Sequence, residues 1–166
     1  MSIDTIEEKY TCNIPQRTFE MLLRKASEDG IQKLVVGAVI LNEQNHVLLL
    51  VRQQGEFMQN LTELPSGGVE EGETLPDALV REVKEETGLD TTAIEAYVDS
   101  FDYTSGSGKK ARQFNCILRV KTGDVSLDPA AHSSYQWADA TRADFLEIGM
   151  SPEVRQTLQK VFETFF

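Results

Sequence analysis

Three glutamates at positions 82, 85 and 86 are the residues of this 166-residue chain whose types and spacing point most directly to chemistry. A helix through this stretch would place Glu82, Glu85 and Glu86 on one face, because residues three and four positions apart are neighbours on a helix surface. Like charges at this spacing destabilise a helix, and these acids also lie near its expected C-terminal end, where the helix dipole favours cations. A hard divalent cation such as Mg²⁺ or Mn²⁺ would offset the repulsion, since both ions prefer carboxylate oxygens. The three carboxylates therefore predict a metal site.

These glutamates belong to a longer pattern of fixed spacing between residues 67 and 89. Gly67 is followed after five residues by Glu73, and after seven more by the run REVKEETGL, which begins at Arg81. The pattern resembles the signature of the Nudix hydrolases, and every specified position matches. A match of this length is much more specific than a short glycine motif. The resemblance implies an α/β (α+β) fold, the Nudix-type α/β/α sandwich with a mixed sheet, in which the signature forms a loop, a helix and a loop.

The same resemblance implies an activity and a set of site residues. Nudix enzymes are similar to one another in hydrolysing a nucleoside diphosphate linked to another moiety, with divalent ions bound at the signature. By position in the pattern, Glu82, Glu85 and Glu86 would be the catalytic residues and the metal ligands. The backbone carbonyl of Ser66 would be a further ligand for Mg²⁺ or Mn²⁺. Family members differ in which carboxylate acts as the base, and Glu82 is one candidate here.

Local chemistry independently supports a helix inside the signature. Thr74 is suited to cap its N-terminus, since a threonine hydroxyl can accept a backbone N–H there, and Gly88 is suited to end it in the left-handed conformation. Gly67 suits a loop that approaches a ligand closely. We expect Glu73 and Arg81 to form a structural ion pair rather than to act on substrate.

Candidates outside the signature carry weaker signals. Arg52, at the end of an expected strand, is our candidate for a phosphate contact. Tyr103 lies close to where diadenosine polyphosphate hydrolases often place a tyrosine. Ala131 stands where many relatives carry an auxiliary glutamate, so either His132 or Asp128 takes that role, or both are ordinary surface residues. The aromatic residues that could stack on a base, or equally belong to the core, are Phe57, Phe101, Tyr103 and Trp137.

The identity of the substrate stays open between several small nucleotide derivatives. A nucleoside triphosphate, a nucleotide sugar, ADP-ribose and a dinucleoside polyphosphate all fit the resemblance. Relatives that cleave ADP-ribose often carry a proline shortly after the signature, and none stands at residues 103–105, which disfavours that substrate. Two other functions also remain: a nucleotide-binding sensor without turnover, and a pyrophosphohydrolase that acts on the 5′ end of RNA.

Composition limits the remaining classes of function. The chain is 40% hydrophobic and 26% charged, as in soluble globular proteins, and no apolar run is long enough to span a bilayer. The net charge of −11 disfavours a long nucleic acid as partner, which would require a basic surface. The opening residues do not resemble a secretory signal, and the two cysteines do not imply a disulfide, so we expect a cytoplasmic protein.

Periodicity and turn residues predict one domain over residues 1–166 with three parts. Residues 1–32 would form an arm and a helix at 15–30, and residues 139–166 a C-terminal helical element with a helix from Ser151. The core, residues 33–138, would contain strands at 34–41, 47–52, 93–103, 112–120 and 135–138. The aromatic C-terminus either packs on the domain or forms a homodimer contact.

Overall fold

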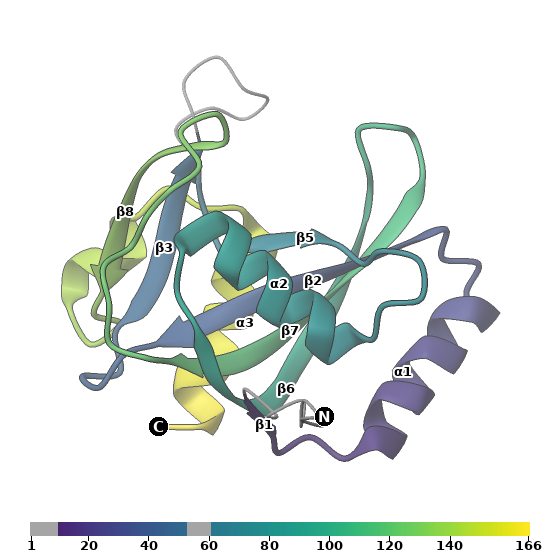
Figure 1. The fold of residues 1–166 in the computed structure, drawn as a ribbon. Coiled ribbons are helices and arrows are strands. Elements are labelled where there is room, and N and C mark those ends of the chain that lie inside the picture. Colours follow the sequence, from purple (N-terminus) through teal and green to yellow (C-terminus); the bar gives the residue numbers. More distant parts are fainter. Residues whose placement is uncertain (1–9, 53–60) are drawn as a thin grey trace.

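A mixed sheet of eight strands forms the middle layer of the computed structural model, which describes residues 10–52 and 61–166 (Figure 1). The path through the sheet is β1-β6-β7-β2-β3-β4, with β5 paired to β2 and β8 paired to β3. The β2–β7 pair is parallel, whereas the β2–β3 and β6–β7 pairs are antiparallel. The strands are β1 (Thr11–Cys12), β2 (Lys33–Leu41), β3 (Val47–Arg52), β4 (Thr62–Glu63), β5 (Ser66–Gly68), β6 (Thr91–Thr104), β7 (Lys110–Val120) and β8 (His132–Ala138).

Helices cover both faces of this sheet, which gives the expected α/β/α arrangement. In Figure 1, α2 lies in front of the sheet, α3 lies behind it, and α1 stands at the side near β1. The helices are α1 (Gln16–Glu28), α2 (Leu75–Thr87) and α3 (Pro152–Thr164), with a short 3₁₀ helix η1 (Ala143–Glu147) before α3. No helix within the described ranges is long and apolar enough to cross a membrane.

Strands β2 and β3 separate two hydrophobic cores, because successive side chains of a strand point to opposite faces. Ile40 and Leu48 belong to the core beneath α1 and α2, whereas their sequence neighbours Leu41 and Leu49 belong to the core beneath α3. All four side chains are at most 1% exposed. A strand buried on both faces reads as a continuous apolar run, which is why these two segments were predictable as strands.

The expected helix ends are confirmed. Thr74 accepts the backbone N–H of Asp77 at the start of α2, and Gly88 ends the helix in the left-handed conformation with φ = 73°. Ser151 caps α3 in the same way by accepting the N–H of Val154, and Gly30 follows α1 with φ = 72°.

Several elements differ from the sequence expectations. The strand expected at 135–138 begins at His132, where it pairs with Arg52 of β3. The short strands β1, β4 and β5, and the 3₁₀ helix η1, were not predicted, since two to five residues are too few to show a period. Phe57 and residues 1–9 of the expected arm lie outside the described residues.

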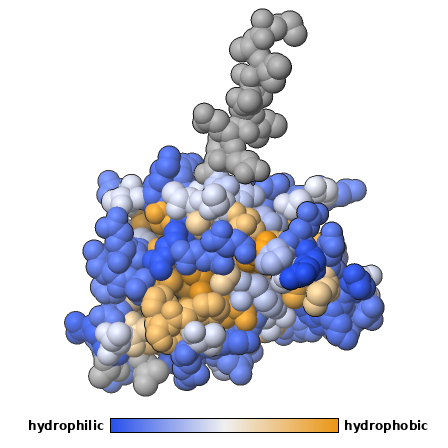
Figure 2. All heavy atoms as spheres, turned by 90° about the horizontal axis from the view of Figure 1, so that it is seen from below, coloured by the Kyte–Doolittle hydropathy of each residue, from blue (hydrophilic) through white to orange (hydrophobic). Residues whose placement is uncertain are grey.

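The C-terminal aromatic residues are partly packed and partly exposed. Phe162 contacts the rings of Phe145 and Phe166, with centroid separations of 6.2 and 5.4 Å. Phe165 and Phe166 nevertheless remain 42% and 54% exposed. Figure 2 shows apolar side chains gathered on part of the underside of the molecule, the side on which Figure 1 places the C-terminus. The homodimer contact stays a prediction.

Candidate active site

Helix α2 carries the three signature glutamates and fixes their positions against the sheet. Its buried residues Ala78, Leu79 and Val83 are at most 1% exposed and belong to the core that α2 shares with β2. This packing anchors the helix along one side, so the polar side is turned toward the loop that precedes it and toward β5. The signature therefore forms the expected loop, helix and loop, with glutamates 82, 85 and 86 in the last turns of the helix.

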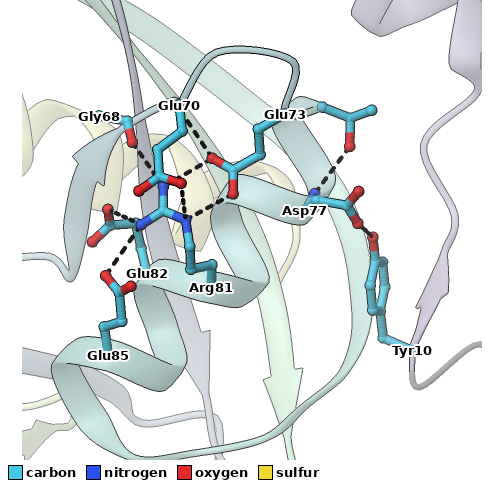
Figure 3. A network of polar contacts seen from close by, with 9 residues as sticks. Tyr10, Gly68, Glu70, Glu73, Asp77, Arg81, Glu82 and Glu85 are labelled. Carbon is cyan, nitrogen blue, oxygen red and sulfur yellow. Dashed lines mark hydrogen bonds and ion pairs between the residues drawn. The ribbon is translucent and has the colours of Figure 1, made fainter.

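Arg81 is the centre of a compact cluster, the Arg81 cluster, which contains Glu73, Glu82, Glu85 and the carbonyl of Gly68 (Figure 3). Its Nε and Nη2 atoms donate to the two oxygens of Glu73 over 2.7 and 2.8 Å. Nη1 donates to Glu82 over 2.8 Å and to Glu85 over 3.1 Å, and Nη2 also donates to the Gly68 carbonyl over 2.9 Å. All five N–H donors of the guanidinium therefore have acceptors.

The ion pair expected between Glu73 and Arg81 is present, and it is bidentate. The hydrogen bonds from Arg81 hold the pKa of the Glu73 carboxyl below its ordinary value. Glu82 behaves differently, because burial raises its pKa although it also contacts Arg81. Glu82 is therefore a desolvated carboxylate that one cation only partly compensates.

Glu86, the third signature glutamate, contacts strand β5. Its Oε2 accepts the backbone N–H of Ser66 over 3.1 Å, which brings the signature helix and strand β5 together. The pKa of Glu86 is raised to about 8, chiefly by burial and also by the neighbouring charges of Glu82 and Glu63, although the Ser66 N–H and Arg52 lower it. A carboxylate in such an environment is unstable as an anion unless a cation is supplied.

Glu63 of β4 connects two of the sequence candidates that lie outside the signature. Its Oε1 lies 2.7 Å from His132 Nε2, and its Oε2 accepts Nε and Nη2 of Arg52 over 2.9 and 2.8 Å. We call Arg52, Glu63 and His132 the Glu63 cluster. Tyr103 is near it: burial raises its pKa, and Arg52 and Glu63 are the charges close enough to shift it. Two distant candidates, Arg52 and His132, thus meet at Glu63, and Arg52 and Glu63 are close enough to Glu86 to shift its pKa.

The remaining candidates take other positions. Asp128 is exposed, and its carboxyl accepts the N–H of Ala130 in the turn that leads into β8. Trp137 and Phe101 are only partly buried, and Trp137 packs against the core beneath α2. Sequence reasoning did not single out Glu63. The available signal was an acid directly before Leu64 and Pro65, in the extended stretch that enters the signature.

The signature glutamates offer carboxylate oxygens as possible ligands for a divalent cation. No group of three or more histidine, cysteine, aspartate or glutamate side chains lies close enough to hold a metal within residues 10–52 and 61–166. Arg81 contacts two of the three signature glutamates, Glu82 and Glu85. The donors fit in kind, because they are hard oxygens and burial disfavours the anionic forms of Glu82 and Glu86. Gly67 adds space, since a Cβ there would overlap the Glu82 carboxylate.

Comparison with known proteins agrees with this geometry. A model of the NUDIX domain matches residues 32–161. Nudix hydrolase 2 of Arabidopsis thaliana is 32% identical over 103 residues, which are 61% of this chain and 37% of that protein. An RNA pyrophosphohydrolase of Wolbachia pipientis subsp. Culex pipiens is 26% identical over 152 residues, with 84% of this chain and 92% of that protein covered.

A solved structure shares the fold. The NUDIX domain of Shewanella oneidensis NrtR, complexed with ADP ribose, has a TM-score of 0.66 and 20% identity, and the match covers 93% of this chain and 95% of that one. The chain spans 35 to 37% of the length of three curated relatives, Nudix hydrolases 2, 10 and 8 of Arabidopsis thaliana. Because the domain match extends over most of the chain and the signature has the expected loop–helix–loop form, the chain belongs to the Nudix family.

Proposed function

We propose that this protein hydrolyses the diphosphate linkage of a nucleoside diphosphate joined to another moiety, in a reaction that depends on Mg²⁺ or Mn²⁺. Nudix hydrolases are generally pyrophosphohydrolases that use divalent metals, and the chain belongs to that family. The observation that carries the proposal is Glu86, a partly buried signature carboxylate that accepts the Ser66 N–H and whose pKa is raised to about 8, chiefly by burial. Such a carboxylate has a strong electrostatic reason to bind a cation.

Each candidate residue receives a role from its position. Glu82, Glu85 and Glu86, with the carbonyl of Ser66, would hold the metal. The metal, when bound, would neutralise phosphate oxygens and acidify the attacking water. Glu82 is our candidate for the base, since its carboxylate is desolvated and therefore more basic than usual.

The surroundings of the glutamates supply substrate contacts in this proposal. The Arg52 side chain is 36% exposed beside Glu86, so its guanidinium can contact a phosphate of the substrate. Tyr103 is 39% exposed on the same side and offers a ring and a hydroxyl to the nucleotide. The His132 side chain is only 4% exposed, which disfavours direct contact with the substrate. Such a contact stays a prediction.

Charge makes the proposed reaction strictly dependent on metal. Residues 67–90 contain eight acidic and two basic residues, so an anionic polyphosphate would be repelled without divalent ions. The same charge makes a small nucleotide the preferred substrate over a transcript, and it favours an enzyme acting on metabolites over a nucleic-acid-binding protein. The Wolbachia relative is named an RNA pyrophosphohydrolase, so RNA belongs in the test as an alternative.

A substrate panel tests the proposal. The purified protein is incubated with Mg²⁺ and nucleoside triphosphates, oxidised nucleotides, nucleotide sugars, ADP-ribose, dinucleoside polyphosphates or 5′-triphosphorylated RNA, and products are separated by chromatography. EDTA and the Glu86→Gln variant are the controls. We expect turnover of a free nucleotide that EDTA abolishes. Glu86→Gln should lower it by more than the roughly 100-fold lost with residues that only orient a metal ligand.

Three results would contradict the proposal in different ways. Full activity of Glu86→Gln would overturn the ligand assignment. Cleavage of RNA alone would replace the small nucleotide by a transcript. Metal-dependent binding of a nucleotide without turnover of any substrate would identify a sensor.

A further inference from the structure

The Glu63 cluster joins three strands through side chains that form a line from the core to the surface. Exposure of the side chain rises from 4% for His132 through 16% for Glu63 to 36% for Arg52. His132 and Arg52 are partners across β3 and β8, next to an irregularity in the register at Val51 and Arg52. Glu63 reaches both of them from β4, on the other edge of β3. The outer end of this line is the residue proposed to meet phosphate.

The Glu63 carboxylate is fixed from two sides. One oxygen accepts two N–H groups of Arg52, and the other faces His132 Nε2 over 2.7 Å. An ionised carboxylate can only accept, so Nε2 donates in this contact. A carboxylate anchored at one oxygen alone can rotate about its last bond, whereas contacts at both oxygens define its plane. The plane of Glu63 in turn sets the direction of the Arg52 guanidinium.

His132 carries a cost that packing alone does not explain. Its Nδ1 is buried and has no hydrogen-bond partner among the described residues. A buried polar atom without a partner is destabilising, and an apolar side chain at this place would avoid that cost. Among the residues that the structure describes, Glu63 is the polar side chain that His132 contacts. Local costs of this kind occur at functional sites.

We propose that His132 is a positioning residue, which orients Arg52 toward the substrate phosphate by fixing Glu63. The inference rests on the proposed function only in taking Arg52 as the phosphate contact. In this role His132 affects the affinity for phosphate and not the chemical step. Loss of His132 should therefore weaken phosphate binding and raise KM, while kcat changes little.

Two amide substitutions at the same position separate positioning from packing. The amide nitrogen of a glutamine can take the place of Nε2 and reach Glu63, whereas that of an asparagine corresponds to Nδ1 and falls short. Both lose the ring and carry an amide, and they differ from each other by one methylene group, so thermal unfolding of both variants is measured alongside. Binding of α,β-methylene ADP in the presence of Mg²⁺ is measured by calorimetry for His132→Gln and His132→Asn. This readout requires no turnover.

We expect His132→Asn to raise Kd by about 10-fold, the lower end for residues that orient a ligand, and His132→Gln to remain within about 3-fold of the wild type. In an Arg52→Ala background the Gln and Asn variants should bind equally, because the effect passes through Arg52. With a hydrolysed substrate, the same ratio should appear in KM and not in kcat.

The outcomes distinguish this inference from the proposed reaction. Equal Kd values for the Asn variant and the wild type would overturn it, and so would a difference between Asn and Gln that persists with Arg52→Ala. Failure of the wild type to bind the nucleotide would overturn it as well, since Arg52 would then contact no phosphate. If the expected pattern of Kd values appears but no substrate is turned over, the inference about His132 stands and the proposed hydrolase activity is wrong.

Discussion

The Arg81 cluster and the surroundings of Glu86 both lie at the signature helix, yet they treat carboxylates in opposite ways. In the Arg81 cluster one guanidinium uses all five donors, and its hydrogen bonds lower the pKa of Glu73. At Glu86 burial raises the pKa to about 8, against one backbone N–H from Ser66. Arg81 compensates the charge of Glu73 within the fold, whereas at Glu86 burial outweighs the groups that favour the anion.

This difference separates residues that stabilise the signature from residues that await a ligand. An anion balanced by a protein cation gains nothing more from a metal, but a desolvated anion does. Glu82 belongs to both regions: it accepts a hydrogen bond from Arg81, and burial still raises its pKa. The position of its carboxylate is therefore the point at which the two regions are coupled.

Gly67→Ala tests that coupling most strongly. A Cβ at Gly67 would overlap the Glu82 carboxylate, which would have to move. The overlap is with the end of a flexible side chain, so the fold should tolerate the change. Since a displacement of about 1 Å in a reacting group can cost about 10²-fold, we expect kcat/KM to fall by about that factor while Tm changes little. Steady-state kinetics and thermal unfolding measure the two effects.

Gly68→Ala is the matched control. Its Cβ would meet only Lys33 Cε at 3.4 Å, an ordinary contact, and neither glycine has a positive φ. Activity within about 3-fold of the wild type is expected, as for a substitution that displaces nothing. Equal losses of activity in the two variants would show that activity depends on the loop backbone and not on the position of the Glu82 carboxylate.

Glu73→Gln tests the Arg81 cluster. The side chain of Glu73 is 14% exposed and that of Arg81 is 22% exposed, so solvent screens their bidentate pair only in part. Hydrogen bonds to charged groups contribute about 1.5–3 kcal/mol, and we expect the free energy of unfolding to fall by about 2 kcal/mol. Urea unfolding measures this change.

The exposed Glu71 provides the comparison. Glu71→Gln should shift the free energy of unfolding by no more than about 0.5 kcal/mol, as surface substitutions usually do. If Glu73→Gln instead abolished turnover and left the melting temperature unchanged, the structural role of Glu73 would be wrong.

The Arg81 cluster was largely predictable from sequence, because its members are close along the chain. Glu73 and Arg81 are eight residues apart, and a capped helix of ordinary length fixes their relation. The signature spacing therefore predicted both the helix and the ion pair between Glu73 and Arg81. It did not reveal that Arg81 would also contact Glu82 and Glu85, since that choice depends on side-chain rotamers.

The Glu63 cluster was not predictable in the same way. Glu63 and His132 are 69 residues apart, and they meet only through the pairing of β4 and β8 with opposite edges of β3. Strand β4 has two residues, too few for any periodic signal. Arg52 and His132 could be chosen one by one by residue type, but their common partner Glu63 could not be.

The pH dependence of stability tests the difference between the two regions through a single proton, the one on Glu86. Glu86 has an unfolded pKa near 4.5 and a native pKa of about 8, so between these values the native state keeps a proton that the unfolded state has lost. Stability must then fall as pH rises through this window, by at most about 1.4 kcal/mol per pH unit. Metal-free wild type should show this slope between about pH 5 and 8 in excess of that of Glu86→Gln.

Urea unfolding in EDTA at a series of pH values measures both proteins, and the difference between their slopes isolates Glu86. Glu73 supplies the opposite sign: with a lowered native pKa, its contribution is present above its ordinary value and is lost as pH falls through the native pKa. Glu73→Gln should therefore remove stability at neutral pH, whereas Glu86→Gln should add it. Parallel curves for wild type and Glu86→Gln would mean that Glu86 is already compensated without metal, and the two regions would then not differ in the way their contacts indicate.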